Sequence, residues 1–416
     1  LHSMLLWRTG EIFLEKPDVA SERRNTLHYL TQVLPHALPA LDVRLRQAWQ
    51  DVGLDAEALN RFGALPRLSA GSWVGGDRDG HPLVTADVTR ESLLDLRLHA
   101  LVGLHADLTE LARRLSLSDL LQTPPETLRE RVFQVAAKQG LAGEAACARN
   151  PEETWRQWVN LMLARLPVEV DQGPRAVLAD GEGRYGDAGE LEDDLSLLDE
   201  SLREVGATRV AERILHPVQR RVAAFGFHSA TLDVRQNSQF HDKALAQILA
   251  AAGIDAAGYP EWPETRRREL LDRELESRRP LTRPGRASGA EADAVLSSFS
   301  VLAEHSDRYG TKGLGALIVS MTRDVSDLLA VHLLAQEAGL VAATPGGDVC
   351  PLEVVPLFET IDDLERSPEI LRDYLAHPAV RRQFAYRTER DGLEAPVQQV
   401  MVGYSDSNKD GGIVAS

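Results

Sequence analysis

Four short apolar runs in the second half of the chain, each followed at once by polar residues, constrain the fold more than any other feature. Their length and their content of β-branched residues are typical of buried parallel strands. We predict strands near 228–235, 315–321, 353–358 and 398–404, in the runs "FGFHSATLDVRQNS", "LGALIVSMT", "LEVVPLFET" and "QQVMVGYSD". Because helical patterns separate these runs, the sequence predicts βα units that form either a barrel or a doubly wound sheet.

The gaps between the predicted strands differ in length. Helical patterns fill two of them: "VSDLLAVHLLAQEAG" follows the second strand, and "SPEILRDYLAHPAVRRQF" follows the third, with Ser367 and Pro368 as its start signal. The gap at 240–312 is far longer and holds its own helices, so we predict a helical insertion there. Its basic loop, 278–286, is either a solvated surface loop or a site for an anionic ligand.

The first part of the chain reads as helices with interrupting loops. Asn150 as N-cap, with proline next, predicts a helix over 151–166. We therefore divide the chain into a mainly helical region, 1–215, and an α/β region, 216–416.

One loop of the helical region, 71–82, contains the sequence "GSWVGGDRDGHP". Its glycine pairs and the Asp-Gly dipeptide require a tight, irregular backbone. Two interpretations follow. Trp73 and Arg78 can offer a flat, charged surface to a small anion, or the segment is a structural Ω-loop before the next helix.

Composition narrows the class of protein. The chain has 416 residues, of which 43% are hydrophobic and 26% charged, as in a globular protein. It shows no apolar run of about eighteen residues and no signal peptide pattern, so we predict a cytoplasmic protein that does not associate with membranes. Cys147 and Cys350 lack the spacing of a zinc or redox motif. The formal net charge of −17 argues against nucleic acid as a partner.

Polar and charged side chains follow the predicted strands at the points where the strands end. In chain order, these residues are Arg235, Thr322 with Arg323, Glu359, and Asp406 with Lys409. In a barrel, the carboxyl ends of the strands face one mouth, so these side chains can meet there. Two carboxylates can hold a Mg²⁺ or Mn²⁺ ion, which keeps positions open for substrate and water. Arg235 and Lys409 would then bind an anion beside that ion.

Each of these residues also has a purely structural interpretation. Thr360 can cap the turn after Glu359, whose charge would favour the helix dipole. Asp406 can form an Asx turn, and a lysine near a strand end is usually solvated. Arg235 can pair with Asp233 or with another acid. The pattern alone leaves both interpretations open.

Four segments taken together resemble the phosphoenolpyruvate carboxylase family in their order and spacing. They are "SWVGGDRDGHP", "FGFHSATLDVRQNS", "VVPLFETIDDL" and "VMVGYSDSNKDGG". Near the start, "LLWRTGEI" is similar to an early helix of that family, so the resemblance covers nearly the whole chain. It implies a predominantly helical α/β protein, with a helical N-terminal region followed by the first half of a (β/α)8 TIM-type barrel that carries a helical insertion. His81 departs from the "DRDGNP" that is common in the family, which affects only the local turn.

The resemblance also implies an activity and a set of site residues. The family carboxylates phosphoenolpyruvate with bicarbonate to give oxaloacetate and phosphate, uses Mg²⁺ or Mn²⁺ without an organic cofactor, and is usually a homotetramer. Matched position by position, Glu359 and Asp406 are the metal ligands, and Arg235 binds the substrate phosphate. Lys409 lies on the bicarbonate side, and Trp73 assists there.

The family's pattern extends beyond this sequence. Its catalytic histidine belongs to a "TAHPTE" segment upstream of the early helix, and its "HGRGG" loop follows the "YSDS" strand; neither segment is in the sequence. The resemblance therefore implies an internal portion of the enzyme, which we expect to be inactive alone. Two other classes stay open: a noncatalytic scaffold or regulatory relative, and another metal-dependent enolate-forming barrel enzyme. The charged residues kept together at the strand ends argue against the first, and "YSDSNKDGG" argues against the second.

Overall fold

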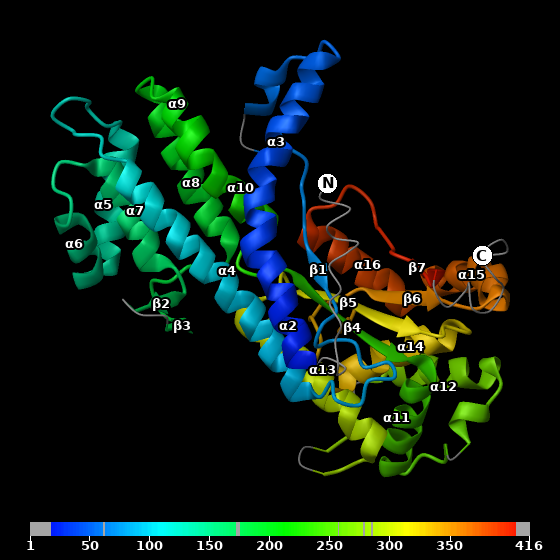
Figure 1. Ribbon diagram of the computed structural model, residues 1–416. Helices are drawn as coiled ribbons and strands as arrows, with labels where there is room; N and C mark the ends of the chain where they lie inside the picture. The colour runs from blue at the N-terminus through cyan, green and yellow to red at the C-terminus, as the bar shows by residue number, and fades with distance from the viewer. Residues whose placement is uncertain are drawn as a thin grey trace.

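The structure, a computed structural model, describes residues 18–404 except 61–62, 172–174, 257, 278 and 284–285. Helices make up most of it, and a parallel sheet lies in the part formed by the second half of the chain (Figure 1). Two predicted site residues, Asp406 and Lys409, lie outside the described residues.

Within the described residues, the parallel sheet has five strands. In spatial order they are β1 (Gly71–Ser72), β4 (Thr231–Asn237), β5 (Leu314–Ser320), β6 (Val354–Phe358) and β7 (Met401–Val402). Every residue of β6 is buried, as expected for an inner parallel strand covered on both faces. A mostly helical chain with this sheet fits a partial (β/α) barrel.

Four strands of this sheet overlap the four apolar runs, and the fifth has no counterpart among the predictions. β4 begins at Thr231 instead of 228, because the preceding Ser229 donates its backbone N–H to Leu96 of a neighbouring helix at 3.0 Å. β7 is only two residues long. The unpredicted strand is β1, which comes from the glycine-rich loop and pairs in parallel with the start of β4.

Helices connect the strands and pack on the sheet. Between β4 and β5 lie α11 (Ser238–Ala251), the short helix η4 (Tyr259–Glu261), α12 (Glu264–Glu276) and α13 (Ala290–Tyr309). α14 (Val325–Glu337) follows β5, and α15 (Ile361–Ala376) and α16 (Pro378–Asp391) follow β6. Apolar side chains of β4, β5 and β6 form one continuous core with those of α11, α13 and α14.

The first half of the chain supplies a second core. The elements that precede β4 are α2 (Val19–His28), η1 (Tyr29–Val33), α3 (Leu34–Asp51), η2 (Ala56–Asn60), α4 (Ala86–Arg114), α5 (Glu126–Gln139), α6 (Leu141–Ala148), α7 (Thr154–Arg165), the antiparallel pair β2 (Val168–Val170) and β3 (Ala176–Leu178), α8 (Ala188–Glu204), α9 (Thr208–Val210), η3 (Ala211–Leu215) and α10 (His216–Phe225). α4 joins the two cores, since its Leu93 and Leu96 pack with the sheet and its Leu101 and Leu104 pack with α7 and α8.

Two helices begin elsewhere than their local signals indicate. α7 begins at Thr154, not at 151, and Asp119 accepts hydrogen bonds from both the backbone N–H (3.0 Å) and the hydroxyl (2.6 Å) of that residue. A carboxylate distant in sequence therefore caps the helix in place of Asn150.

α15 begins at Ile361, so Pro368 lies inside it instead of marking its start. Proline has no N–H to donate to the carbonyl of Leu364 four residues earlier. The hydroxyl of Ser367 donates to that carbonyl at 2.8 Å instead, which satisfies the acceptor and lets the helix continue.

A membrane-spanning helix is absent from the described part of the chain, where no helix combines the necessary length with the necessary apolar character.

Candidate active site

Arg235, Met321 and Glu359 lie at one edge of the sheet, which is the edge formed by the carboxyl ends of β4, β5 and β6. The strands are parallel, and Met321 and Glu359 directly follow β5 and β6, whereas Arg235 lies within β4, two residues before its end at Asn237. Glu359 follows β6 directly and is only 6% exposed. Its charge acts on Arg235: hydrogen bonds to Asp77 raise the pKa of Arg235, and the charges of Asp77, Asp79 and Glu359 act in the same direction, against burial.

The glycine-rich loop is fixed along β4 by backbone hydrogen bonds. The N–H of Arg235 donates to the carbonyl of Gly76 at 3.1 Å, and the N–H of Arg78 donates to the carbonyl of Arg235 at 2.9 Å. After β1, the chain therefore continues as an irregular segment that runs beside β4 as far as Arg235. The loop lines the same edge of the sheet that carries Glu359.

Asp77 is the partner of Arg235. Its two carboxylate oxygens accept from Nε and Nη2 of the guanidinium, each at 2.8 Å, which is the bidentate geometry that arginine favours. The sequence named Asp233 first as a structural partner, but Asp233 instead accepts from the backbone N–H of Ala316 at 2.8 Å. The "GGDRDG" sequence is the signal that points to this pairing. Its glycines let the loop approach the backbone of a neighbouring strand, and the same loop carries two acids.

The other loop residues also have defined places. Asp79 accepts from the hydroxyl of Ser320, the last residue of β5, at 2.6 Å. Arg78 donates from Nη1 to the carbonyl of Ala294 in α13 at 2.9 Å, so it anchors the loop. Trp73 is 53% exposed at the start of the loop. The two acids of the loop thus bind the ends of two neighbouring strands.

Glu359 is held from both sides. The backbone N–H of Met321 donates to its Oε2 at 2.7 Å. On the other side, Gly403 after β7 donates its N–H to the carbonyl of Phe358 at 2.9 Å, and a Cβ on Gly403 would lie 2.7 Å from the Cγ of Glu359. Glycine is required there because the chain passes against the Glu359 side chain. Asp406 follows three residues later, outside the described residues.

The structural interpretation of Thr360 also holds. Its hydroxyl accepts from the backbone N–H of Asp363 at 3.1 Å and caps α15. This cap leaves Glu359 as the residue between β6 and the helix, at the edge of the sheet. A capping role for Thr360 and a ligand role for Glu359 are therefore compatible.

The donor chemistry of this edge fits a hard divalent ion. Among the described residues, no group of three or more His, Cys, Asp or Glu side chains is arranged to hold a metal. Mg²⁺ usually takes one or two carboxylates and fills its other positions with water or substrate oxygens. Glu359, a buried carboxylate oriented by a backbone amide, is suited to be one of those ligands.

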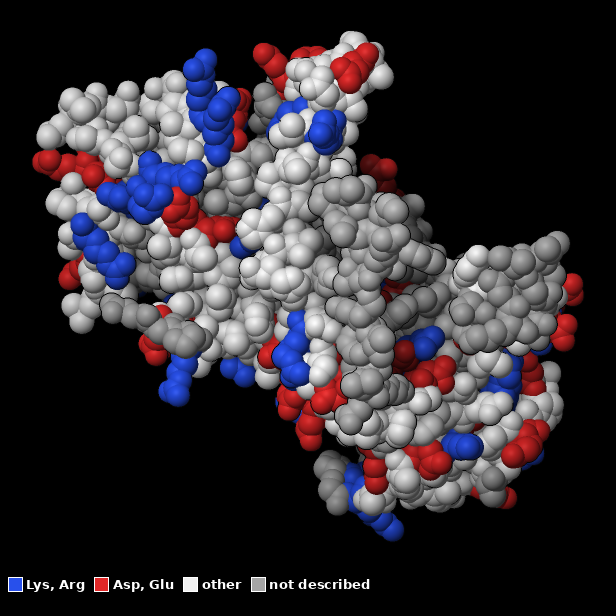
Figure 2. Space-filling view, in the orientation of Figure 1, with Lys and Arg blue, Asp and Glu red and all other residues white. Residues whose placement is uncertain are grey.

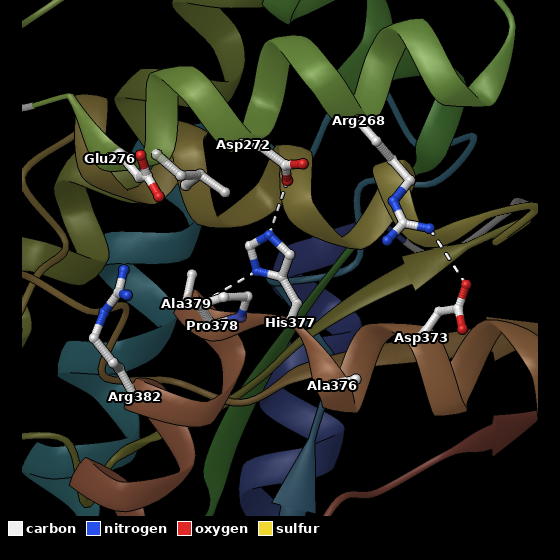
Figure 3. A pocket seen from close by; sticks show the side chains of 10 residues that line it. Arg268, Asp272, Glu276, Asp373, Ala376, His377, Pro378, Ala379 and Arg382 are labelled. Carbon is white, nitrogen blue, oxygen red and sulfur yellow. Dashed lines mark hydrogen bonds and ion pairs between the residues drawn. The ribbon is translucent and has the colours of Figure 1, made fainter.

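A pocket elsewhere on the molecule has a different character. The cavity in Figure 3, about 400 Å³, is lined by residues from α12, α15 and α16 and the turn between the last two. His377 contacts Asp272 at 2.9 Å, and Arg268 contacts Asp373 at 3.3 Å, so these polar side chains of the pocket pair with each other. It lies on the outer helices and not at the strand ends.

Among the described residues, the face of the molecule seen in Figure 2 has no large patch of one charge. Acidic and basic side chains are interspersed over the face seen in Figure 2. An anion at the strand ends would therefore be attracted by individually placed groups, of which Arg235 is the described example.

Replacing Gly76 by alanine tests how closely the loop must approach β4. A Cβ at this position would lie 2.0 Å from the backbone carbonyl oxygen of Asp233, so loop and strand would have to separate. We expect urea unfolding to show a loss of about 2–3 kcal/mol. Gly71→Ala is the matched control in the same segment, since its Cβ would meet only the Thr231 hydroxyl at 3.7 Å. Equal losses for the two variants would contradict the close approach.

The fold and this edge of the sheet define a class: proteins built on a βα framework, with charged side chains gathered where parallel strands end. A sequence model of the phosphoenolpyruvate carboxylase family matches residues 3–416. The phosphoenolpyruvate carboxylase of Methylorubrum extorquens is 35% identical over 99% of this chain and 44% of its own length. Those of Mycobacterium avium and Xanthomonas oryzae pv. oryzae are both 36% identical over 99% of this chain and 42% of their own length.

The chain belongs to the phosphoenolpyruvate carboxylase family. It spans less than half the length of these curated relatives.

Proposed function

We propose that this chain contributes part of the active site of an enzyme that carboxylates phosphoenolpyruvate with bicarbonate, giving oxaloacetate and phosphate. The observation that carries the proposal is that Arg235 and Glu359 lie toward the carboxyl ends of strands of one parallel sheet, where Asp77 pairs with Arg235 and Asp79 of the same loop reaches the end of β5. The charge of Glu359 is among those that raise the pKa of Arg235. A cation that suits phosphate and a carboxylate that suits a divalent ion are the two groups this substrate requires.

Arg235 binds the phosphate of the substrate in this proposal. Asp77 engages its Nε and one N–H of Nη2, which leaves the second fork, formed by Nη1 and the other N–H of Nη2, as the bidentate donor for phosphate oxygens. The Asp77 pair fixes the plane of the guanidinium in advance, so less conformational entropy is lost when the phosphate binds.

Glu359 and Asp406 are the proposed ligands of a divalent ion, Mg²⁺ or Mn²⁺, without an organic cofactor. When bound, the ion would supply positive charge for the enolate oxygen that develops on the substrate. Met321 would orient Glu359 for this task, and Gly403 would bring the segment that contains Asp406 beside it. Lys409 and Trp73 are assigned to the bicarbonate side.

The proposed chemistry balances without another reactant. A bicarbonate oxygen attacks phosphorus, the bond from phosphorus to the enol oxygen breaks, and carboxyphosphate and the enolate of pyruvate form. Carboxyphosphate then separates into CO₂ and phosphate, and the enolate carbon captures the CO₂. Arg235 offsets negative charge on the phosphoryl oxygens while the leaving oxygen becomes an enolate.

The finer structural assignments are proposals of the same kind. We infer that the sheet belongs to a complete (β/α)8 barrel, that 240–312 is a helical insertion on it, and that the chain divides into a mainly helical region, 1–215, and a barrel region, 216–416. A homotetrameric assembly and a cytoplasmic location are further expectations that follow from the resemblance and the composition.

Bicarbonate labelled with ¹⁸O in all three oxygens tests the reaction. We expect a protein that contains this chain to form oxaloacetate only with a divalent ion present, and the phosphate to carry one labelled oxygen, because attack on phosphorus transfers that atom. Mass spectrometry of the phosphate gives the readout, and a chelator is the control. Oxaloacetate with unlabelled phosphate would contradict the attack on phosphorus, and absence of oxaloacetate would favour a noncatalytic relative.

A further inference from the structure

We propose that Ser238 is a positioning residue for Glu359, and that it acts through the backbone of Met321. The inference rests on the proposed function, because it assigns Glu359 the role of metal ligand. Three elements take part: Ser238 begins α11 after β4, Met321 follows β5, and Glu359 follows β6. None of the sequence patterns marked Ser238 or Met321.

Met321 has an unusual backbone. Its φ is +51°, and among the described residues only one other non-glycine residue, Glu152, has a positive φ. L residues with side chains rarely adopt this conformation, and where they do, the surroundings must hold them in it. Such residues occur preferentially at functional sites. The position of Met321, at the carboxyl end of a central strand, agrees with that tendency.

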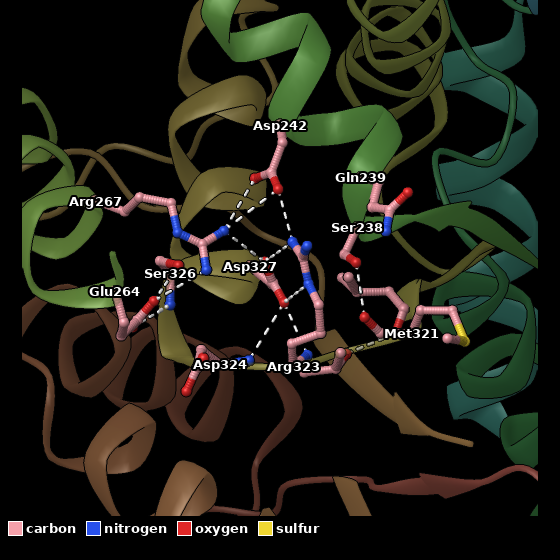
Figure 4. A network of polar contacts seen from close by, with 12 residues as sticks. Ser238, Gln239, Asp242, Glu264, Arg267, Met321, Arg323, Asp324, Ser326 and Asp327 are labelled. Carbon is pink, nitrogen blue, oxygen red and sulfur yellow. Dashed lines mark hydrogen bonds and ion pairs between the residues drawn. The ribbon is translucent and has the colours of Figure 1, made fainter. Parts of the chain in front are cut away.

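The backbone N–H and the carbonyl of Met321 are both hydrogen-bonded to side chains of residues that follow the two neighbouring strands. Its N–H donates to Oε2 of Glu359 at 2.7 Å, and its carbonyl accepts from the hydroxyl of Ser238, also at 2.7 Å. Figure 4 shows Ser238 pointing at Met321 from the start of α11. One residue thus links the helix after β4 to the acid after β6.

The residues after Met321 are fixed as well. The N–H of Thr322 donates to the carbonyl of Leu357 at 3.2 Å, and its hydroxyl donates to the carbonyl of Val319 at 2.7 Å. Arg323 donates to Asp242 at 2.6 Å and to Asp327 at 2.7 Å (Figure 4). The Met321 carbonyl and the Thr322 N–H belong to one planar peptide unit, so the Ser238 hydroxyl and the Leu357 carbonyl fix that peptide from its two sides.

Ser238 is fully buried, with no exposed surface, so its hydroxyl has no water to replace the Met321 carbonyl. Its loss would leave that carbonyl without this donor, and the turn could then relax toward an ordinary φ. The N–H that orients Glu359 would turn with it. Groups that orient metal ligands without touching the metal typically contribute 10–100-fold to metal affinity.

The test measures Mn²⁺ binding to the full chain by electron paramagnetic resonance, together with the melting temperature. We expect Ser238→Ala to weaken Mn²⁺ binding about tenfold, and Ser238→Thr, which keeps the hydroxyl, to restore most of the affinity. Ser238→Cys fills nearly the same space with a weaker donor. The Ser238→Cys variant should bind Mn²⁺ with an intermediate affinity. It replaces Ser238→Ala in the test if the alanine variant does not fold.

The matched control is Ser201→Ala. Ser201 is another buried serine whose hydroxyl donates to a backbone carbonyl, that of Leu198 at 2.8 Å, in the helical part of the molecule. It should lower the melting temperature without changing Mn²⁺ affinity. Equal Mn²⁺ affinities for the Ser238→Ala and Ser201→Ala variants would overturn the inference.

The variant Glu359→Gln separates this inference from the proposed function. If Glu359→Gln abolishes Mn²⁺ binding but Ser238→Ala does not weaken it, only the role of Ser238 is wrong. If Glu359→Gln itself leaves Mn²⁺ binding unchanged, the proposed metal site is wrong and the role of Ser238 is wrong with it.

Discussion

Replacing Glu359 by glutamine in a protein that contains this chain is expected to lower kcat/KM for the proposed substrate, phosphoenolpyruvate, by about 10³-fold or more, because it removes a negative charge that the divalent ion needs and several kcal/mol of stabilisation with it. Glutamine keeps the length of the side chain and an oxygen that can accept from Met321, so the fold should survive. Mn²⁺ affinity should fall more than about 100-fold, beyond the range of residues that only orient a ligand. Kinetics and electron paramagnetic resonance give the two readouts.

Glu353→Gln is the control, at the opposite end of β6. Glu353 precedes β6 at its amino end, where it is as buried as Glu359 and pairs with Arg387 at 2.8 Å. Breaking a buried pair costs about 3–5 kcal/mol of stability, but the metal site at the other end of the strand should keep its Mn²⁺ affinity. A parallel loss of Mn²⁺ affinity in both variants would mean that Glu359 supports the fold and does not bind the ion.

The sequence predicted the strands because their signal is local. Buried parallel strands must be apolar over several consecutive residues, and a polar residue at their end marks where the backbone leaves the sheet. Arg235 and Glu359 were found for this reason, as the first polar side chains at the ends of β4 and β6 that suit an anion and a metal. Their roles stay predictions, and Asp406 and Lys409 stay outside the described residues.

The contacts that organise the site could not be predicted because they join distant parts of the chain. The partner of Arg235 is Asp77, 158 residues away in sequence, in a loop whose strand β1 has only two residues. No apolar run marks so short a strand. Nothing in "SMTR" indicates the positive φ of Met321 either, since that conformation is imposed by Ser238, by Glu359 and by the turn that follows.

The helix starts show the same limit. Asn150 and Pro151 are good local start signals, yet α7 begins at Thr154, where the carboxylate of Asp119 is available. Ser367 and Pro368 form a local start signal, yet α15 begins at Ile361 and the Ser367 hydroxyl donates to the carbonyl that Pro368 leaves without its usual donor. At α7, the hydrogen bonds of Asp119 outweigh a local capping preference of about 1 kcal/mol. At Pro368, the Ser367 hydrogen bond offsets only part of the cost of a proline inside a helix, which is about 3 kcal/mol.

Replacing Arg267 by methionine is expected to destabilise the fold by about 3–5 kcal/mol, because it leaves buried carboxylates without their main partner. Arg267 lies in α12 and donates to Asp242 at 3.3 Å, to Asp327 at 3.2 Å and to Glu264 at 3.3 Å (Figure 4). Without it, Asp242 and Asp327 share the single guanidinium of Arg323, and Glu264 keeps only the hydrogen bonds from Ser326. Urea unfolding at pH 7 measures the loss.

The pH dependence distinguishes lost charge pairing from lost packing. Burial raises the pKa of Asp242, with the charge of Asp327 acting in the same direction, and burial also raises the pKa of Glu264. Removing Arg267 raises both pKa values further, so the folded variant binds protons that the unfolded chain has already released. Its stability deficit should therefore shrink as the pH falls from 7 toward 5.

Arg266→Met makes the same substitution one position earlier in α12. The Arg266 guanidinium lies 3.6 Å from the centre of the Trp262 ring at the surface, so its loss should cost about 1 kcal/mol and show no such pH dependence. A deficit in the Arg267 variant that stays constant or grows on acidification would mean that packing of the arginine stem, and not its charge, stabilises this network.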